Sequence, residues 1–288
     1  IIDELSPIPD VNKTYLQKLQ LANAQAHMNY LNTKTTWTLG RLGDDLNPAE
    51  AIYEVLINNY WGCDYSRDNK IDVESLLDLG ITCEREGLGV SIQYNRLSPA
   101  DTLISGILNH INGVKYDDPR TGKLTFKLIR NDYDDAELKV FDTDNCVDME
   151  FSRLDWSETV SSVSAKFIDA SNKYLEGQLM CVDVANIKIT KNQSEESVDA
   201  SYFTTATNAK WMAQNQLLSL AYPLSSVEIE CNRAGYDVVV GEPIIVTWNP
   251  YGISKMIFRV TSIDYGSLES GNIKISAIED VFGFEKTD

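Results

Sequence analysis

Oxygen-bearing side chains recur at alternate positions in the segment from Asp64 to Asp72, which reads Asp-Tyr-Ser-Arg-Asp-Asn-Lys-Ile-Asp. Alternating oxygen ligands are typical of calcium-binding loops. Such a loop also needs a glycine at its sharp turn and a bidentate glutamate at its end. Asn69 and Ser75 stand at those positions, and Glu74 comes one residue early. We therefore interpret the segment as a structural loop in which Asp72 caps the next helix, with weak metal binding as the alternative.

Adjacent carboxylates at Asp134/Asp135 and at Glu195/Glu196 could serve a hydrolase that works with two acids. Glycoside hydrolysis requires its two carboxylates on opposite sides of a cleft, and acidic pairs are common in a chain this acidic. The sequence contains no Gly-x-Ser-x-Gly nucleophile turn and no Gly-x-x-x-x-Gly-Lys phosphate loop. We predict no catalytic residue and no enzyme activity, and keep a cell-wall hydrolase with two carboxylates as an alternative.

Histidine and cysteine, the usual ligands of transition metals, are scarce and scattered. His27 and His110 have no cysteine close to them in the sequence, so a Cys/His dyad has no support, and we interpret both as surface or interface residues. The cysteines lack C-x-x-C spacing, which indicates buried free thiols in a reducing cell. They are Cys63, Cys83, Cys146, Cys181 and Cys231. We expect no metal site and no cofactor.

Charge and length bound the function classes further. The chain has 288 residues, 43% of them apolar, which is enough for two hydrophobic cores. Its net charge of -18 repels phosphate, which argues against direct nucleic-acid binding and against docking on anionic lipid. It contains no apolar run of about 18 residues, so we predict no membrane segment. The start at Ile1, without a methionine or a signal peptide, suggests a piece of a longer protein.

The first half of the chain shows helical patterns around a small sheet. The clearest helix is predicted from Asn47 to Asn59, with Asn47 as cap, Pro48 at the first position and Gly62 as a left-handed terminator. We expect it to pack on the hairpin predicted for residues 114–129. The further predicted elements are helices at 12–31, 72–87 and 98–113, with caps at Asp72 and Ser98 and a stop at Gly113, and strands at 33–42 and 90–94.

The second half reads as a series of short strands interrupted by one helix. Their short spacing suggests a small barrel or sandwich. The predicted strands are 140–141, 147–151, 160–168, 187–189, 226–231, 244–248, 256–263 and 273–278, and the helix runs from 208 to 222. The fold class is therefore α+β: helices on a small antiparallel sheet, then a mostly antiparallel β-barrel or sandwich with one helix. We divide the chain into a lead-in at 1–45, an α+β module at 46–150 and a barrel-like domain at 151–288.

Several short sequence motifs, taken in their order along the chain, resemble those of the central tail-tip or baseplate-hub proteins of long-tailed bacteriophages. The resemblance covers residues 46–282, and Ser161 stands where that family usually has Asn. The motifs are Asn47-Pro48-Ala49 with residues 52–56, Tyr60-Trp61-Gly62, residues 98–108, Gly122-Lys123-Leu124, residues 156–163, Phe167-Ile168-Asp169, Ala209 with Ala213, residues 238–246, Phe258-Arg259-Val260 and Ile278-Glu279-Asp280.

This resemblance implies a structural protein of the virion, made in the bacterial cytoplasm. Three copies would surround the tail axis and close or extend the tail tube, with distal-tail, tape-measure and receptor-binding proteins as partners during host attachment and genome ejection. An acidic inner wall would keep DNA from sticking during passage. The alternative is a carbohydrate-binding or adhesion module at a phage tail tip or on a bacterial surface.

Overall fold

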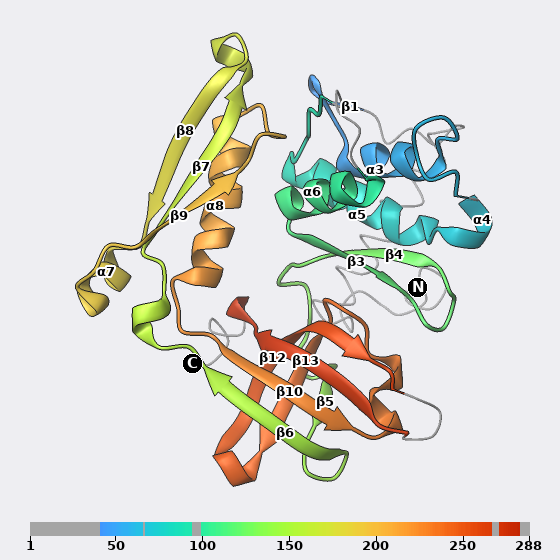
Figure 1. Cartoon of the computed structure of the whole chain (residues 1–288), viewed down its shortest axis with the longest axis vertical. Coiled ribbons are helices and arrows are strands. Elements are labelled where there is room, and N and C mark those ends of the chain that lie inside the picture. Colours follow the sequence, from blue (N-terminus) through green and yellow to red (C-terminus); the bar gives the residue numbers. More distant parts are fainter. Residues whose placement is uncertain (1–40, 66, 94–98, 267–270, 283–288) are drawn as a thin grey trace, which may run out of the picture.

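A computed structural model describes residues 41–65, 67–93, 99–266 and 271–282. Three parts are visible in Figure 1: a group of helices over a hairpin, a three-stranded sheet backed by a long helix, and a curled six-stranded sheet below both. Helices and mostly antiparallel strands confirm the predicted α+β class. The helix predicted at 12–31, residues 33–40 of the strand predicted at 33–42, and His27, Trp37, Tyr94 and Ser98 lie outside the described residues.

Helix α3 (Pro48–Ile57) begins as predicted, because the Asn47 side chain accepts a hydrogen bond from the Ala49 N–H at 3.0 Å. It ends at Ile57, before Gly62, so the prediction of Gly62 as its left-handed terminator is wrong. Glycine is required at position 62 for a steric reason instead. A Cβ there would lie 2.2 Å from the Val55 carbonyl oxygen, so only glycine allows this approach of the chain to α3.

Two more helices follow close to their predicted bounds, α5 (Val73–Glu86) and α6 (Ala100–Ile111). Gly87 ends α5 in the left-handed conformation that glycine favours. Asn112 takes that conformation after α6, so the predicted stop at Gly113 is one residue late. The strand predicted at 90–94 is reduced to a bridge between Val90 and Leu46. The short elements nearby are β1 (Arg41–Leu42), β2 (Asp45–Leu46) and α4 (Arg67–Lys70).

The hairpin of β3 (Gly113–Asp117) and β4 (Leu124–Leu128) is confirmed, but α3 does not pack on it as expected. Helix α3 packs chiefly against α5 and α6, and these two helices contact the hairpin (Figure 1). Ile52 and Leu56, on the apolar face of α3, are almost fully buried there. Helices α5 and α6 therefore form a layer between α3 and the hairpin.

In the second part, β7 (Ser162–Asp169) pairs antiparallel with β8 (Leu175–Val182) and parallel with β9 (Glu195–Asp199). Helix α8 (Ala206–Leu220) covers one face of this sheet (Figure 1). The sequence predicted β7 and α8, but neither β8 nor β9.

The strand predicted at 187–189 is wrong, because these residues belong to helix α7 (Val184–Thr190). The Asp183 carboxylate accepts hydrogen bonds from the Ala185 and Asn186 N–H groups and so caps this helix.

The six-stranded sheet has the order β5-β11-β12-β13-β10-β6, with β5 and β6 as its outer edges. Every pair in it is antiparallel except β5 with β11. All six strands lie close to their predicted positions. Their bounds are β5 Lys139–Phe141, β6 Cys146–Arg153, β10 Ser225–Cys231, β11 Pro243–Trp248, β12 Ile253–Asp264 and β13 Ile273–Glu279. Single 3-10 turns are η2 (Trp156–Glu158), η3 (Ala170–Asn172), η4 (Arg233–Asp237) and η5 (Asn249–Tyr251).

Two clusters of buried apolar side chains stabilise these parts. One joins the helices and hairpin to the three-stranded sheet and α8, and includes Ile52, Phe126 and Phe203. The other fills the inner face of the six-stranded sheet and includes Phe141 and Phe258. Each cluster combines residues from several segments that are far apart in the sequence. The predicted division at 45 and 150 stays a prediction.

Candidate functional site: an acidic face on the six-stranded sheet

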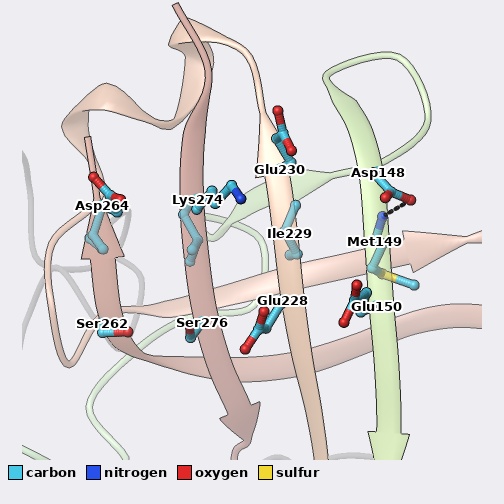
Figure 2. Close-up of a pocket in the computed structure, with 12 residues that line it drawn as sticks. Asp148, Met149, Glu150, Glu228, Ile229, Glu230, Ser262, Asp264, Lys274 and Ser276 are labelled. Atoms are coloured by element: carbon cyan, nitrogen blue, oxygen red, sulfur yellow. Dashed lines mark hydrogen bonds between the residues drawn. The ribbon is translucent and has the colours of Figure 1, made fainter. Parts of the chain in front are cut away.

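Four neighbouring strands, β12, β13, β10 and β6, carry apolar side chains on one face and charged side chains on the other. Met149, Ile229 and Ile275 are almost fully buried on the core face. Since side chains alternate along a strand, their neighbours in sequence point the opposite way. The residues on that opposite face include Asp148, Glu150, Glu228, Glu230, Asp264, Lys274, Ser262 and Ser276 (Figure 2). They line a hollow of about 380 Å³, which we call the acidic face.

The strand register brings like charges together on the acidic face. Glu228 lies directly opposite Glu150, and Glu230 lies opposite Asp148. Like charges in such cross-strand pairs repel each other and destabilise a sheet. Folding therefore places carboxylates side by side where uncharged residues would be more stable.

Lys274 is the cation among the residues that line this hollow, and it lies between two acids. Its strand partners are Glu230 on β10 and Asp264 on β12. Figure 2 shows its side chain between β13 and β10. One cation offsets only part of the negative charge of five carboxylates, so the acidic face carries a negative potential that repels phosphate and attracts basic groups.

Weak metal binding by the segment from Asp64 to Asp72 stays an alternative, because Ser66 of this segment lies outside the described residues. Within the described residues, no group of three or more His, Cys, Asp or Glu side chains is placed to hold a metal ion. The segment from Asp64 to Asp72 contains α4, and Asp72 occupies the position before α5. Its carboxylate makes no capping hydrogen bond, so the predicted side-chain cap is wrong. The Asp72 carbonyl instead accepts from the Ser75 hydroxyl at 2.8 Å.

The acidic pairs noted in the sequence are not brought together as catalytic pairs. Glu195 and Glu196 are consecutive residues of β9, so their side chains point to opposite faces of the sheet. Asp134 accepts a hydrogen bond from the Ala136 N–H at 3.0 Å, which is a turn contact.

His110 is buried inside the chain, so it is not a surface residue. Its ring stacks on Tyr202 with 4.4 Å between the centroids, which joins α6 to the segment before α8. The five cysteines are free thiols, and all but Cys63 are buried. Burial raises the pKa of Cys83 to about 12, so this thiol stays protonated and unreactive at neutral pH.

Sequence reasoning missed the acidic face. Each strand showed its alternation, as in Val227-Glu228-Ile229-Glu230, but the sequence does not show that β6 pairs with β10. Trp61 and Trp156 are 46% and 37% exposed, although large aromatic side chains are mostly buried.

Comparison with known proteins gives the family. A family model described as "Putative phage tail protein" (Phage-tail_3) matches residues 89–263. This match spans more than half of the chain, and the chain belongs to this family. The protein is thus a structural component of phage tails, in line with the resemblance found in the sequence. No curated protein sequence matches the chain, and no described helix is long and apolar enough to span a bilayer.

Solved structures of tail proteins are similar to this chain. The tail protein from Neisseria meningitidis MC58 is 14% identical, with a TM-score of 0.50, and the match covers 68% of this chain and 60% of that one. A chain in the virion of the native gene transfer agent particle is 10% identical, with a TM-score of 0.48, and the match covers 63% of this chain and 39% of that one. The 43 kDa tail protein of prophage MuSo2 from Shewanella oneidensis is 13% identical, with a TM-score of 0.42, and the match covers 67% of this chain and 56% of that one. The likeness to the Neisseria protein indicates a shared fold, and this chain spans less than two thirds of each of these three proteins.

Proposed function

We propose that the protein is part of a tail-tip hub, in which three copies surround the tail axis and close or extend the tail tube. Its partners would be distal-tail, tape-measure and receptor-binding proteins, and the chain would contribute packing surfaces without catalysis. The observation that carries this proposal is the acidic face, because its repulsive cross-strand pairs lower stability and call for a role outside folding.

The edges of the two larger sheets suit ring contacts. Strands β5 and β6 border the six-stranded sheet, and β8 and β9 border the three-stranded one. Edge strands present backbone groups on which another chain can pair. On β8, the apolar side chains Met180 and Val182 are two residues apart, so they lie on the same face, and they are 51% and 43% exposed, as in a surface that a neighbour covers.

We further propose that the acidic face points toward the channel through which DNA passes. DNA carries a dense row of phosphate charges, and a basic wall would hold it by releasing counterions. An acidic wall prevents this adhesion and lets the genome slide.

Two measurements on virions test the proposal. Quantitative mass spectrometry of purified particles should give three copies per virion. A gold label on a tag inserted at the β7–β8 turn, beside the exposed Tyr174, should appear at the tail end in electron micrographs. A label along the tail shaft, or a different copy number, would contradict the hub assignment.

A third measurement tests the channel wall separately. The substitutions Asp148→Asn, Glu150→Gln, Glu228→Gln and Glu230→Gln remove four charges from the acidic face and should slow DNA ejection from the virion. The matched control removes four exposed carboxylates away from the acidic face and from the edges of the two larger sheets, through Glu74→Gln, Glu84→Gln, Asp44→Asn and Asp117→Asn. Equal ejection rates for the two variants would remove the role of the acidic face in DNA passage.

A further inference from the structure

A second hollow, of about 300 Å³, lies beside η2, between that turn and the loop that links α7 to β9. Its volume is at the lower end of the range typical of small-molecule sites. Its lining combines two apolar side chains with several polar ones. Residues that line it include Trp156, Ile189, Asp155, Thr190, Asn192 and Ser194. We call it the Trp156 hollow.

One wall of the Trp156 hollow is fixed by a capping box. The Asp155 carboxylate accepts a hydrogen bond from the Ser157 N–H at 2.9 Å, and Glu158 accepts one from the Asp155 N–H at 2.9 Å. The Thr159 hydroxyl donates to the Trp156 carbonyl at 2.8 Å. These bonds hold the backbone on both sides of Trp156, so the indole is presented to solvent from a rigid turn.

The opposite wall is also held in place. The hydroxyls of Ser161 and Ser162 donate to the Ser194 carbonyl at 2.9 and 3.0 Å, and the Ser194 N–H donates back to Ser161 at 2.9 Å. The Thr190 hydroxyl donates to the Asn186 carbonyl at 2.9 Å. A ligand would therefore meet a preformed site and would not have to order the loop.

The exposed groups of the Trp156 hollow are an unusual set for a surface turn. Trp156 and Ile189 are 37% and 55% exposed, although both are large apolar side chains that folding tends to bury. Beside them lie the Asp155 carboxylate and the exposed amide of Asn192. Hydrogen bonds from Ser157 lower the pKa of Asp155, so this group is an ionised acceptor at neutral pH.

These groups match the surface of a sugar. One face of a pyranose ring carries C–H groups with partial positive charge, which pack on the negative face of an indole. Its hydroxyls both donate and accept, so a carboxylate acceptor and an amide can bond them together. A phosphate-bearing ligand would be repelled by Asp155, and a purely apolar ligand would leave the polar groups without water or partners. We propose that the Trp156 hollow binds a neutral saccharide unit of a glycan.

Saturation-transfer difference NMR on the protein tests this proposal, with a panel of neutral hexoses and N-acetylhexosamines at about 10 mM, a concentration suited to weak binding. At least one sugar should receive saturation. Its affinity, measured by titration, should fall about tenfold or more in Trp156→Ala, which corresponds to about 1.4 kcal/mol. Asp155→Asn keeps a capping side chain and should weaken binding without lowering the unfolding temperature.

Trp61→Ala is the matched control, since it removes another exposed tryptophan on a different loop, and it should bind as the wild type does. The proposal is overturned if no sugar in the panel receives saturation, or if Trp156→Ala binds as tightly as the wild type. It is also overturned if Trp156→Ala changes the oligomeric state and leaves sugar binding intact. Because the test uses the protein in solution, its result is independent of where the label appears on the tail.

Discussion

The Nε2 atom of His110 accepts a hydrogen bond from the backbone N–H of Tyr202 at 3.2 Å. The other ring nitrogen, Nδ1, lies 2.8 Å from the Gly106 carbonyl and donates to it when the ring is neutral. The neutral tautomer therefore satisfies both contacts, whereas a protonated ring would turn a second donor toward the Tyr202 N–H. Burial lowers the pKa of His110, while the nearby Asp199 carboxylate works in the opposite direction.

This geometry predicts that stability falls as the pH falls. The folded state has the lower pKa, so it binds fewer protons than the unfolded chain, whose histidine pKa is about 6.5. The stabilisation is fully present above about pH 6.5 and is lost as the pH drops toward the pKa of the folded state. Urea unfolding at pH 7.5 and 5.5 measures the effect. The loss of stability between the two pH values should be smaller in His110→Gln, because glutamine does not titrate. Other groups titrate in both proteins, so some loss remains in the variant. Equal losses in the two proteins would contradict the role of His110.

The buried ion pair between Arg259 and Asp280 gives a second prediction. Arg259 donates to the Asp280 carboxylate at 2.7 Å and to the Arg130 carbonyl at 3.1 Å, so it joins the six-stranded sheet to the segment after the hairpin. Both side chains are almost fully buried. Asp280→Ala would leave the guanidinium buried without its counter-charge and should destabilise by about 3–5 kcal/mol.

The control for this prediction is the ion pair of Asp101 with Lys115, in which Asp101 is largely exposed. Asp101→Ala should cost less than about 1 kcal/mol, because water screens such pairs. Both free energies of unfolding can be read from urea titrations. If Asp280→Ala and Asp101→Ala lower the free energy of unfolding by similar amounts, the prediction that burial makes the Asp280 ion pair more important would be wrong.

Asn47 gives a third prediction, because it serves two elements at once. Its Oδ1 caps α3, and its Nδ2 donates to the Gly80 carbonyl of α5 at 2.9 Å. Asn47→Ala removes both the cap and the additional hydrogen bond to the Gly80 carbonyl, so it should cost about 1–3 kcal/mol. Asn47→Ser can keep the cap and should recover about 1 kcal/mol of that loss. A loss no larger than that of the cap alone would contradict the second contact.

Local signals accounted for much of the fold. Asn47 followed by Pro48, and Gly87 after an apolar helical pattern, marked helix ends that the structure confirms. Alternating apolar residues marked the strands of the six-stranded sheet. The signals failed where a helix cap outweighs an alternating apolar pattern and where a close backbone approach decides. Asp183 turned an apolar stretch with strand character into α7, and Gly62 is required by the Val55 carbonyl, which the sequence pattern cannot reveal.

The acidic face was beyond sequence reasoning for a topological reason. Glu150 and Glu228 come from strands that are far apart in the sequence and become neighbours only because β6 pairs with β10. Each strand by itself looks like an ordinary half-exposed strand with a solvated face. Only the strand order reveals that the charges of four strands share one surface.

That shared surface leads to a fourth prediction, on stability and salt. Glu228→Gln removes the repulsion with Glu150 across the strands, so it should stabilise the protein by about 0.2–1 kcal/mol at low ionic strength. Screening acts over about 10 Å at 0.1 M salt, so added salt should stabilise the wild type more than the variant. Glu84→Gln, on the exposed side of α5, changes the net charge equally and should show neither effect. If Glu228→Gln and Glu84→Gln respond alike to salt, the repulsion comes from the net charge of the whole chain. The acidic face would then have no local repulsion that calls for a role outside folding.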